Sequence, residues 1–120
     1  MKLLTASLVA AVSVVAMAGR AGAAGAITVK GEVVELECSV SNAGSAHGEA
    51  HAACAMRCAR RGNQMAILTA NEVYLVEGDY AANNNAKLLD FVAKHIEAKG
   101  HVSERDGRKI FNVAAMMVAK

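Results

Sequence analysis

The sequence predicts a mainly β fold that also contains helices. Five stretches rich in β-branched residues are separated by turn residues, which is typical of short strands. A helical pattern of apolar residues separates the first two stretches, and a shorter one separates the third from the fourth. Five strands, the first of them long and bent at a glycine, match the Greek-key barrel of an OB-fold. We therefore expect a five-stranded OB-like barrel with a helix inserted between strands 1 and 2 and a short helix between strands 3 and 4.

The first strand is predicted over residues 27–38, where apolar and charged side chains alternate. Alternation places Val34, Leu36 and Cys38 on one face of this strand. Gly31 lies inside the stretch, and a glycine inside a strand indicates a bend or a bulge. Cys38 is thereby predicted to end the strand on its apolar face.

The inserted helix is predicted over residues 46–61, after a turn-rich stretch of small and polar residues. Residues three and four apart share one face of a helix, so His51, Cys54 and Cys58 form one stripe. His47 extends that stripe toward the start of the helix. The apolar neighbours of the cysteines indicate that the stripe borders the body of the domain.

The remaining elements follow from local signals in the second half of the chain. Gly62 predicts a glycine C-cap for the inserted helix. The turn Asp106-Gly107 predicts a hairpin between the last two strands. Strands are predicted over residues 65–69, 73–77, 94–105 and 109–118, with a turn at residues 70–72 and a short helix around Leu88, Leu89 and Val92.

The N-terminus reads as a signal peptide, because Lys2 is followed by an apolar run and then by small residues. The run ends near residue 18, which makes it shorter than the roughly 20 residues of a comfortable membrane span. We assign residues 1–23 to the signal peptide and residues 24–120 to a single OB-like domain. The expected location is periplasmic or secreted, with no membrane association after cleavage.

Charge and aromatic content argue against nucleic acid as a partner. The chain has 13 basic and 11 acidic residues, and loss of Lys2 and Arg20 with the signal peptide leaves 11 of each. A neutral domain lacks the electrostatic attraction that drives binding to phosphate backbones. Aromatic residues make up 3% of the chain, too few for a base-stacking platform. The sequence leaves a protein partner and the oligomeric state open.

The three cysteines and the nearby histidine predict a metal site. Cys38, Cys54, Cys58 and His51 would supply three sulfur ligands and one nitrogen ligand. Zinc accepts such a set in closed tetrahedral sites, and thiolate-rich sets suit Cu(I). We therefore expect copper or zinc as the cofactor if this site binds one.

A disulfide is the alternative use of the same cysteines. Cys38 could pair with Cys54 or with Cys58, and such a bond stabilises a small exported domain by about 2–4 kcal/mol. An odd cysteine remains in either pairing. The protein would then be a structural or interaction module without a metal and without catalysis.

Sequence motifs for catalysis are weak. There is no glycine-framed serine elbow, and the acidic residues show no paired pattern. A cysteine nucleophile assisted by His51 would need an orienting group that the sequence does not indicate. We expect a binding or accessory protein and not an enzyme.

Four segments of the chain resemble small secreted bacterial proteins that have an OB-like domain and no assigned activity. The segments are GEVVELEC (31–38), HAACAMRC (51–58), ILT (67–69) and YLV (74–76). This resemblance covers most of the chain after the signal peptide. It implies an OB-like fold whose helical insertion bears the Cys/His cluster, and it implies little about mechanism, since a fold does not set a function.

Overall fold

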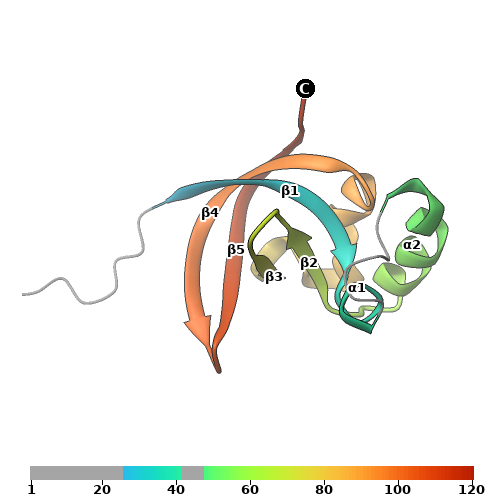
Figure 1. The fold of residues 1–120 in the computed structure, drawn as a ribbon, viewed down its shortest axis with the longest axis horizontal. Coiled ribbons are helices and arrows are strands. Elements are labelled where there is room, and N and C mark those ends of the chain that lie inside the picture. The colour runs from blue at the N-terminus through green and yellow to red at the C-terminus, as the bar shows by residue number, and fades with distance from the viewer. Residues whose placement is uncertain (1–25, 42–47) are drawn as a thin grey trace, which may run out of the picture.

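The computed structural model describes residues 26–41 and 48–120 of the chain, and it is mainly β with several helices (Figure 1). The predicted signal peptide at residues 1–23 and His47 lie outside these described residues. No helix in the described ranges is long and apolar enough to cross a membrane. The elements follow the chain in the order β1 (Ile27–Glu35), α1 (Leu36–Ser41), η1 (Glu49–His51), α2 (Ala52–Arg60), β2 (Met65–Leu68), β3 (Val73–Glu77), η2 (Gly78–Tyr80), α3 (Ala82–Asn85), η3 (Ala86–Phe91), β4 (His95–Arg105) and β5 (Arg108–Val118), where η marks a 3-10 helix.

The five strands close in a ring with the order β1-β2-β3-β5-β4. All neighbouring pairs are antiparallel except β3 and β5, which are parallel. The ring closes through β1, whose first part pairs with β4 and whose last part pairs with β2. Glu32 belongs to both registers, opposite His95 on one side and Leu68 on the other. The prediction of five strands in one sheet, with helical connections after the first and third strands, is confirmed.

Two glycines mark places where strands approach each other closely. Gly31 lies where β1 changes partners, and a Cβ at this position would collide with the carbonyl oxygen of Leu68. Gly100 lies at the register shift of the β4–β5 pair, where a Cβ would collide with the carbonyl oxygen of Asn112. The register shift lies between Lys99 and Gly100 of β4. At Gly31, where a bend or a bulge was predicted, β1 continues as one curved strand (Figure 1).

The β4–β5 hairpin confirms the turn prediction. Asp106 and Gly107 both have positive φ angles, of 54° and 74°. Such a pair suits a two-residue hairpin turn whose twist matches that of the flanking strands. The two strands pair from Arg105 and Arg108 at the turn to Ile96 and Val118 at the far end.

The prediction that Cys38 ends the first strand is wrong. β1 ends at Glu35, and the next six residues form the short helix α1. The side chain of Glu35 caps this helix, because its Oε2 accepts a hydrogen bond of 2.7 Å from the backbone N–H of Cys38. The alternation of residues 35–38 fits a strand and equally the first turn of a helix. The predicted strand was therefore extended three residues too far, from Glu35 to Cys38.

The inserted helix is shorter than predicted. The 3-10 turn η1 precedes α2, which spans Ala52–Arg60. The predicted glycine cap is confirmed, because Gly62 has φ of +85° and its N–H bonds to the carbonyl of Ala59. The N–H of Asn63 bonds to the carbonyl of Cys58, which completes a Schellman-type ending.

The connection between β3 and β4 consists of short helical turns. Three successive asparagines, Asn83, Asn84 and Asn85, have φ angles of 54°, 52° and 59°, so no regular right-handed helix can run through them. The buried side chain of Asn85 donates hydrogen bonds to the carbonyls of Ala59 at 2.9 Å and Asn63 at 3.0 Å. The Asn85 amide thus joins the connection between β3 and β4 to the C-terminal end of α2 by hydrogen bonds.

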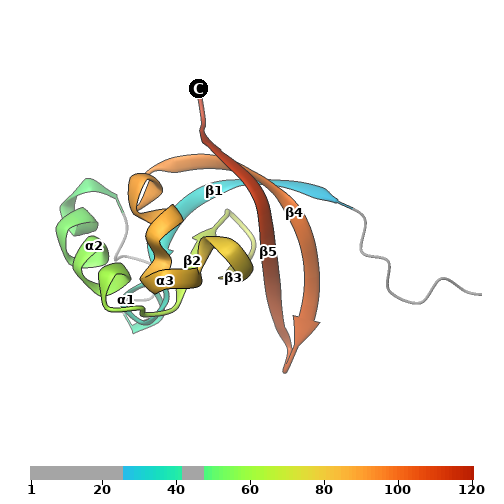
Figure 2. The same ribbon diagram turned by 180° about the vertical axis from the view of Figure 1, so that it is seen from behind.

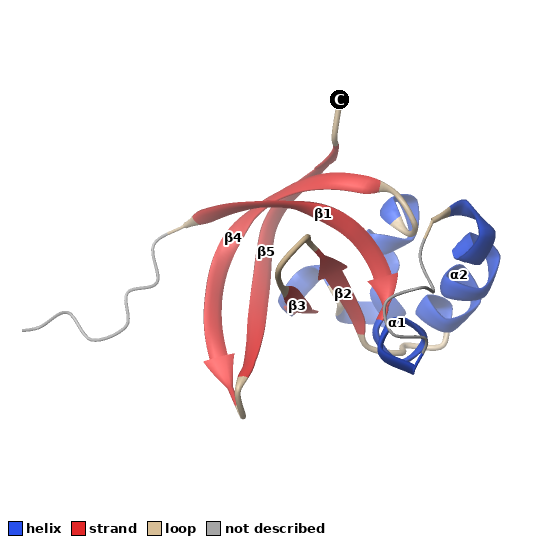
Figure 3. Cartoon of the chain, in the orientation of Figure 1, coloured by secondary structure: helices blue, strands red, loops and turns tan. Residues whose placement is uncertain are grey.

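The helices collect on one side of the strands (Figures 2 and 3). Leu88 of η3 and the small residues Ala55 and Ala59 of α2 pack there against the sheet residues of the main core. The core side chains with no exposed surface include Val33, Met65, Ile67, Val76, Leu88, Ile96 and Phe111. Aliphatic residues therefore supply most of the core, as the low aromatic content predicts.

Candidate functional site

The three cysteines lie on two neighbouring helices. Cys38 is half-buried in α1, Cys58 is half-buried in α2, and Cys54 is exposed one turn before Cys58. We refer to Cys38, Cys54 and Cys58 as the thiol cluster. Both views of the ribbon place α1 beside α2 (Figures 1 and 2). No two cysteines of the described residues are joined by a disulfide.

Cys38 has the most perturbed acidity of the cluster. A hydrogen bond from its thiol to the carboxylate of Glu35, together with partial burial, raises the pKa of Cys38 from 9.0 to about 12. The negative charges of Glu35 and of the other two cysteines, once ionised, act in the same direction. Cys38 is therefore a protonated thiol at neutral pH.

The pKa of Cys58, on α2, is raised as well. Burial raises its pKa most, and the charges of Cys54 and Glu35 and a hydrogen bond with the Cys54 thiol add to this shift. Arg61 acts in the opposite direction and lowers the pKa of Cys58. Glu35, Cys54 and Cys58 all influence Cys38, and Glu35 and Cys54 influence Cys58, so the two helices bring these groups within electrostatic range.

The predicted partner His51 lies apart from this group. It is exposed at the start of α2 and borders a small cavity together with Glu32 and Gly48. Among the described residues, the groups that shift the pKa of Cys38 and Cys58 are Glu35, Arg61 and the cysteines themselves, and do not include His51. In their present rotamers, no three Cys, His, Asp or Glu side chains of the described residues converge closely enough to hold an ion.

Glu35 is the member of the site that the sequence did not reveal. Its residue surface is 2% exposed, and Oε2 accepts the N–H of Cys38. Its other oxygen, Oε1, is buried and has no hydrogen-bond partner in the structure of the described residues. Glutamate is not among the preferred helix-capping residues, so its position before α1 carried no signal for this role.

A second buried glutamate on the same strand provides a contrast. Glu32 is 5% exposed, and both of its carboxylate oxygens accept the backbone N–H of Gly48, at 3.1 and 3.2 Å. Gly48 has φ of +78° and precedes the turn η1. Glu32 therefore caps the start of η1, and Glu35 caps the start of α1.

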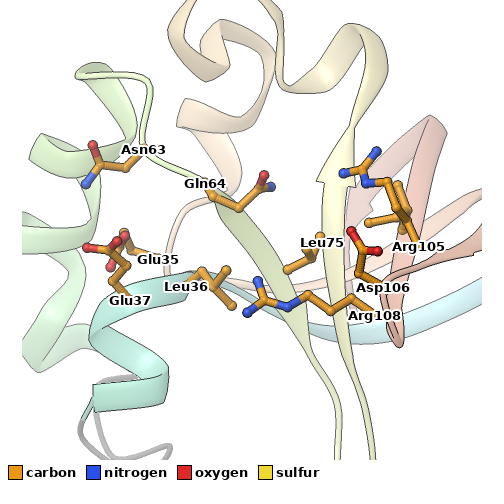
Figure 4. A pocket seen from close by; sticks show the side chains of 10 residues that line it. Glu35, Leu36, Glu37, Asn63, Gln64, Leu75, Arg105, Asp106 and Arg108 are labelled. Carbon is orange, nitrogen blue, oxygen red and sulfur yellow. The ribbon is translucent and has the colours of Figure 1, made fainter.

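A cleft of about 760 Å³ opens beside Glu35, between α1 and the β4–β5 hairpin (Figure 4). Glu35 and Glu37 line one side, and Arg105 and Arg108 line the other. Leu75 of β3 lies between the two sides. The hairpin side is held in place by an ion pair of Arg105 with Glu77 of β3.

The chain matches no protein-family profile, no curated protein and no solved structure.

Proposed function

We propose that this chain is an exported, OB-like Greek-key protein whose first helical connection binds a soft transition metal, copper or zinc. The ring of five strands supports the OB-like assignment, because β1 pairs with both β2 and β4, and helices follow the first and third strands. The signal-peptide pattern at residues 1–23 supports export to the periplasm or the medium.

The observation that supports the metal proposal is that the thiol of Cys38, on α1, lies within electrostatic range of Cys54 and Cys58, on α2. A cation that replaces the protons of neighbouring thiols removes the repulsion between their thiolates. His51 remains the predicted nitrogen donor for the fourth position.

A binding role fits these thiols better than a catalytic one. A cysteine nucleophile needs a lowered pKa, which neighbouring cations or a helix N-terminus normally provide. The pKa of Cys38 is instead raised to about 12 by Glu35. We therefore propose an accessory or carrier protein and not an enzyme.

The same proximity also favours the alternative, a disulfide between Cys38 and one of the α2 cysteines. Cys54 and Cys58 both lie within electrostatic range of Cys38, so either pairing stays open. A disulfide would join α1 to α2 and leave one cysteine over. The protein would then be a stapled interaction module.

One experiment separates the two. Protein purified from the periplasm is analysed for metals and for intact mass, before and after chelation and thiol alkylation. Near-stoichiometric copper or zinc, with three alkylatable cysteines after chelation, is the expected result. A metal-free protein that is two protons lighter and has one alkylatable thiol would overturn the metal proposal and establish the disulfide.

A further inference from the structure

We propose that the cleft between α1 and the β4–β5 hairpin binds an extended peptide that carries a basic and an acidic side chain on either side of an apolar one. The basic side chain of the peptide lies beside Glu35 and Glu37, and its acidic side chain lies beside Arg108. This site is separate from the proposed metal function, because it uses none of the three thiols.

The cleft is part of a longer groove. A second cleft of about 630 Å³ adjoins the cleft of about 760 Å³ that Figure 4 shows. The two clefts share four lining residues, Leu36, Glu37, Leu75 and Arg108. Pockets for compact small molecules have volumes of about 300–1,000 Å³, so a groove that continues beyond one such volume suits an extended chain.

The floor of the groove is apolar. Leu75 of β3 and Ile110 of β5 are 6% and 5% exposed, and the half-buried Leu36 packs against the small cluster to which they belong. Their neighbours Val76 and Phe111 belong to the main core, so Leu75 and Ile110 lie on the opposite face of the sheet. This face offers contact to an apolar side chain of the peptide.

The acidic side of the groove consists of a buried and an exposed carboxylate. Glu35 is 2% exposed, and its Oε1 has no hydrogen-bond partner among the described residues. Glu37 is exposed on α1, on the same side of the cleft (Figure 4). Neither carboxylate belongs to an ion pair of the described ranges. Lysine and arginine side chains of a peptide carry the donors that such carboxylates accept.

The basic side of the groove has one arginine available to a ligand. Arg105 and Lys109 are already paired with glutamates at or next to the ends of β3. Arg108 is exposed and forms no ion pair within the part of the chain that the structure describes. Figure 4 shows its side chain reaching from the hairpin toward Leu36. A guanidinium group binds a carboxylate through two parallel hydrogen bonds, so Arg108 suits an acidic side chain.

The opposite charges of the two sides select the kind of ligand. A peptide with one basic and one acidic side chain can satisfy both sides at once. A purely acidic ligand would meet repulsion from Glu35 and Glu37, and a purely basic one would meet repulsion from Arg108. The same repulsion disfavours the phosphates of a nucleic acid.

Affinities of the chain without its signal peptide for short blocked peptides test the inference. Acetylated and amidated tetrapeptides with lysine and glutamate around a Leu-Leu centre, in both orders, are compared with a neutral peptide that has glutamine at both ends. Exposed ion pairs contribute little individually, so the better dipolar peptide should bind roughly 3–20-fold more tightly than the neutral one. NMR titration at low salt measures the affinities.

Two variants locate the binding site. Arg108→Glu and Glu37→Lys each reverse the charge of one exposed wall residue, and each should abolish the advantage of the dipolar peptide. Both should leave the affinity for the neutral peptide within about twofold, because the apolar floor is unchanged. Arg60→Glu is the matched control, because Arg60 is an exposed arginine of α2 that lines neither cleft.

Three results would overturn the inference. One is equal affinity for the dipolar and neutral peptides, and another is no binding of any peptide up to about 1 mM. The third is Arg108-dependent binding of a single-stranded oligonucleotide without binding of the peptides, which would assign the groove to nucleic acid. Metal analysis of the same protein is a separate readout, so failure here leaves the proposed metal function intact.

Discussion

The two helical connections of the sheet differ in what they contribute. The connection between β3 and β4 places Leu88 and Asn85 in the interior, at 0% and 3% exposure. The connection between β1 and β2 contributes the small residues Ala55 and Ala59 to the core and keeps its cysteines at or near the surface. The connection between β3 and β4 closes the hydrophobic core, and the connection between β1 and β2 carries the thiols. Substitutions in the first should therefore lower the free energy of unfolding, and substitutions in the second should change the reactions of the thiols.

The largest effect is expected in the connection that closes the core. Leu88→Ala removes a fully buried side chain, and such changes cost about 2–5 kcal/mol of unfolding free energy. Chemical denaturation of the variant and the wild type measures the difference. Leu89→Ala, at a half-buried neighbour, should cost clearly less. Equal losses at the two positions would show that η3 does not pack as described.

An effect of intermediate size is expected at the asparagine that joins the two connections. Asn85→Gly keeps a residue that tolerates φ of 59° but removes the two hydrogen bonds to Ala59 and Asn63. Leaving buried carbonyls without their donor costs about 1–3 kcal/mol, which thermal or chemical unfolding detects. Asn84→Gly is the control, because Asn84 has a similar φ of 52° and an exposed side chain. Similar losses in both variants would assign the effect to the backbone.

A small effect on stability is expected in the connection that carries the thiols. Cys54 is exposed, so Cys54→Ala should change the unfolding free energy of metal-free protein by less than about 0.5 kcal/mol. The same variant should lose most of its bound copper or zinc if the thiol cluster binds metal. A marked loss of stability in the metal-free, oxidised protein would instead point to a disulfide that uses Cys54.

A separate effect concerns the dependence of stability on pH. The pKa of Cys38 is raised from 9.0 to about 12, so its protonated form is favoured by folding. This contribution to stability is complete below pH 9 and is lost as the pH rises from 9 toward 12. Mass-resolved alkylation at pH 8 should modify the exposed Cys54 first and Cys38 last. Glu35→Gln should speed the modification of Cys38 and flatten the alkaline loss of stability.

Much of the fold could be predicted because its signals are local. The turn at Asp106-Gly107, the glycine after α2 and the β-branched strands each depend on a few neighbouring residues. The three left-handed asparagines could not be predicted, since their conformation depends on tertiary contacts such as those of Asn85.

The candidate site was predicted in part. Periodicity placed Cys54 and Cys58 on one helix, and the structure brings Cys38 close to them from α1 and not from a strand. Glu35 was missed because its role depends on burial and on one unpaired oxygen, neither of which leaves a pattern in sequence. Helical spacing also linked His51 to the cysteines, and its role as a ligand stays a prediction, although α2 begins only at the next residue.

The double pairing of β1 also bears on how the chain reaches its fold. Ile27 of β1 pairs with Gly100, and Glu35 of β1 pairs with Met65. The two partner strands of β1 thus lie at very different separations from it in sequence. Contacts between residues far apart in sequence form late and slow the folding of β-rich domains. The ring therefore closes only after β4 is in place.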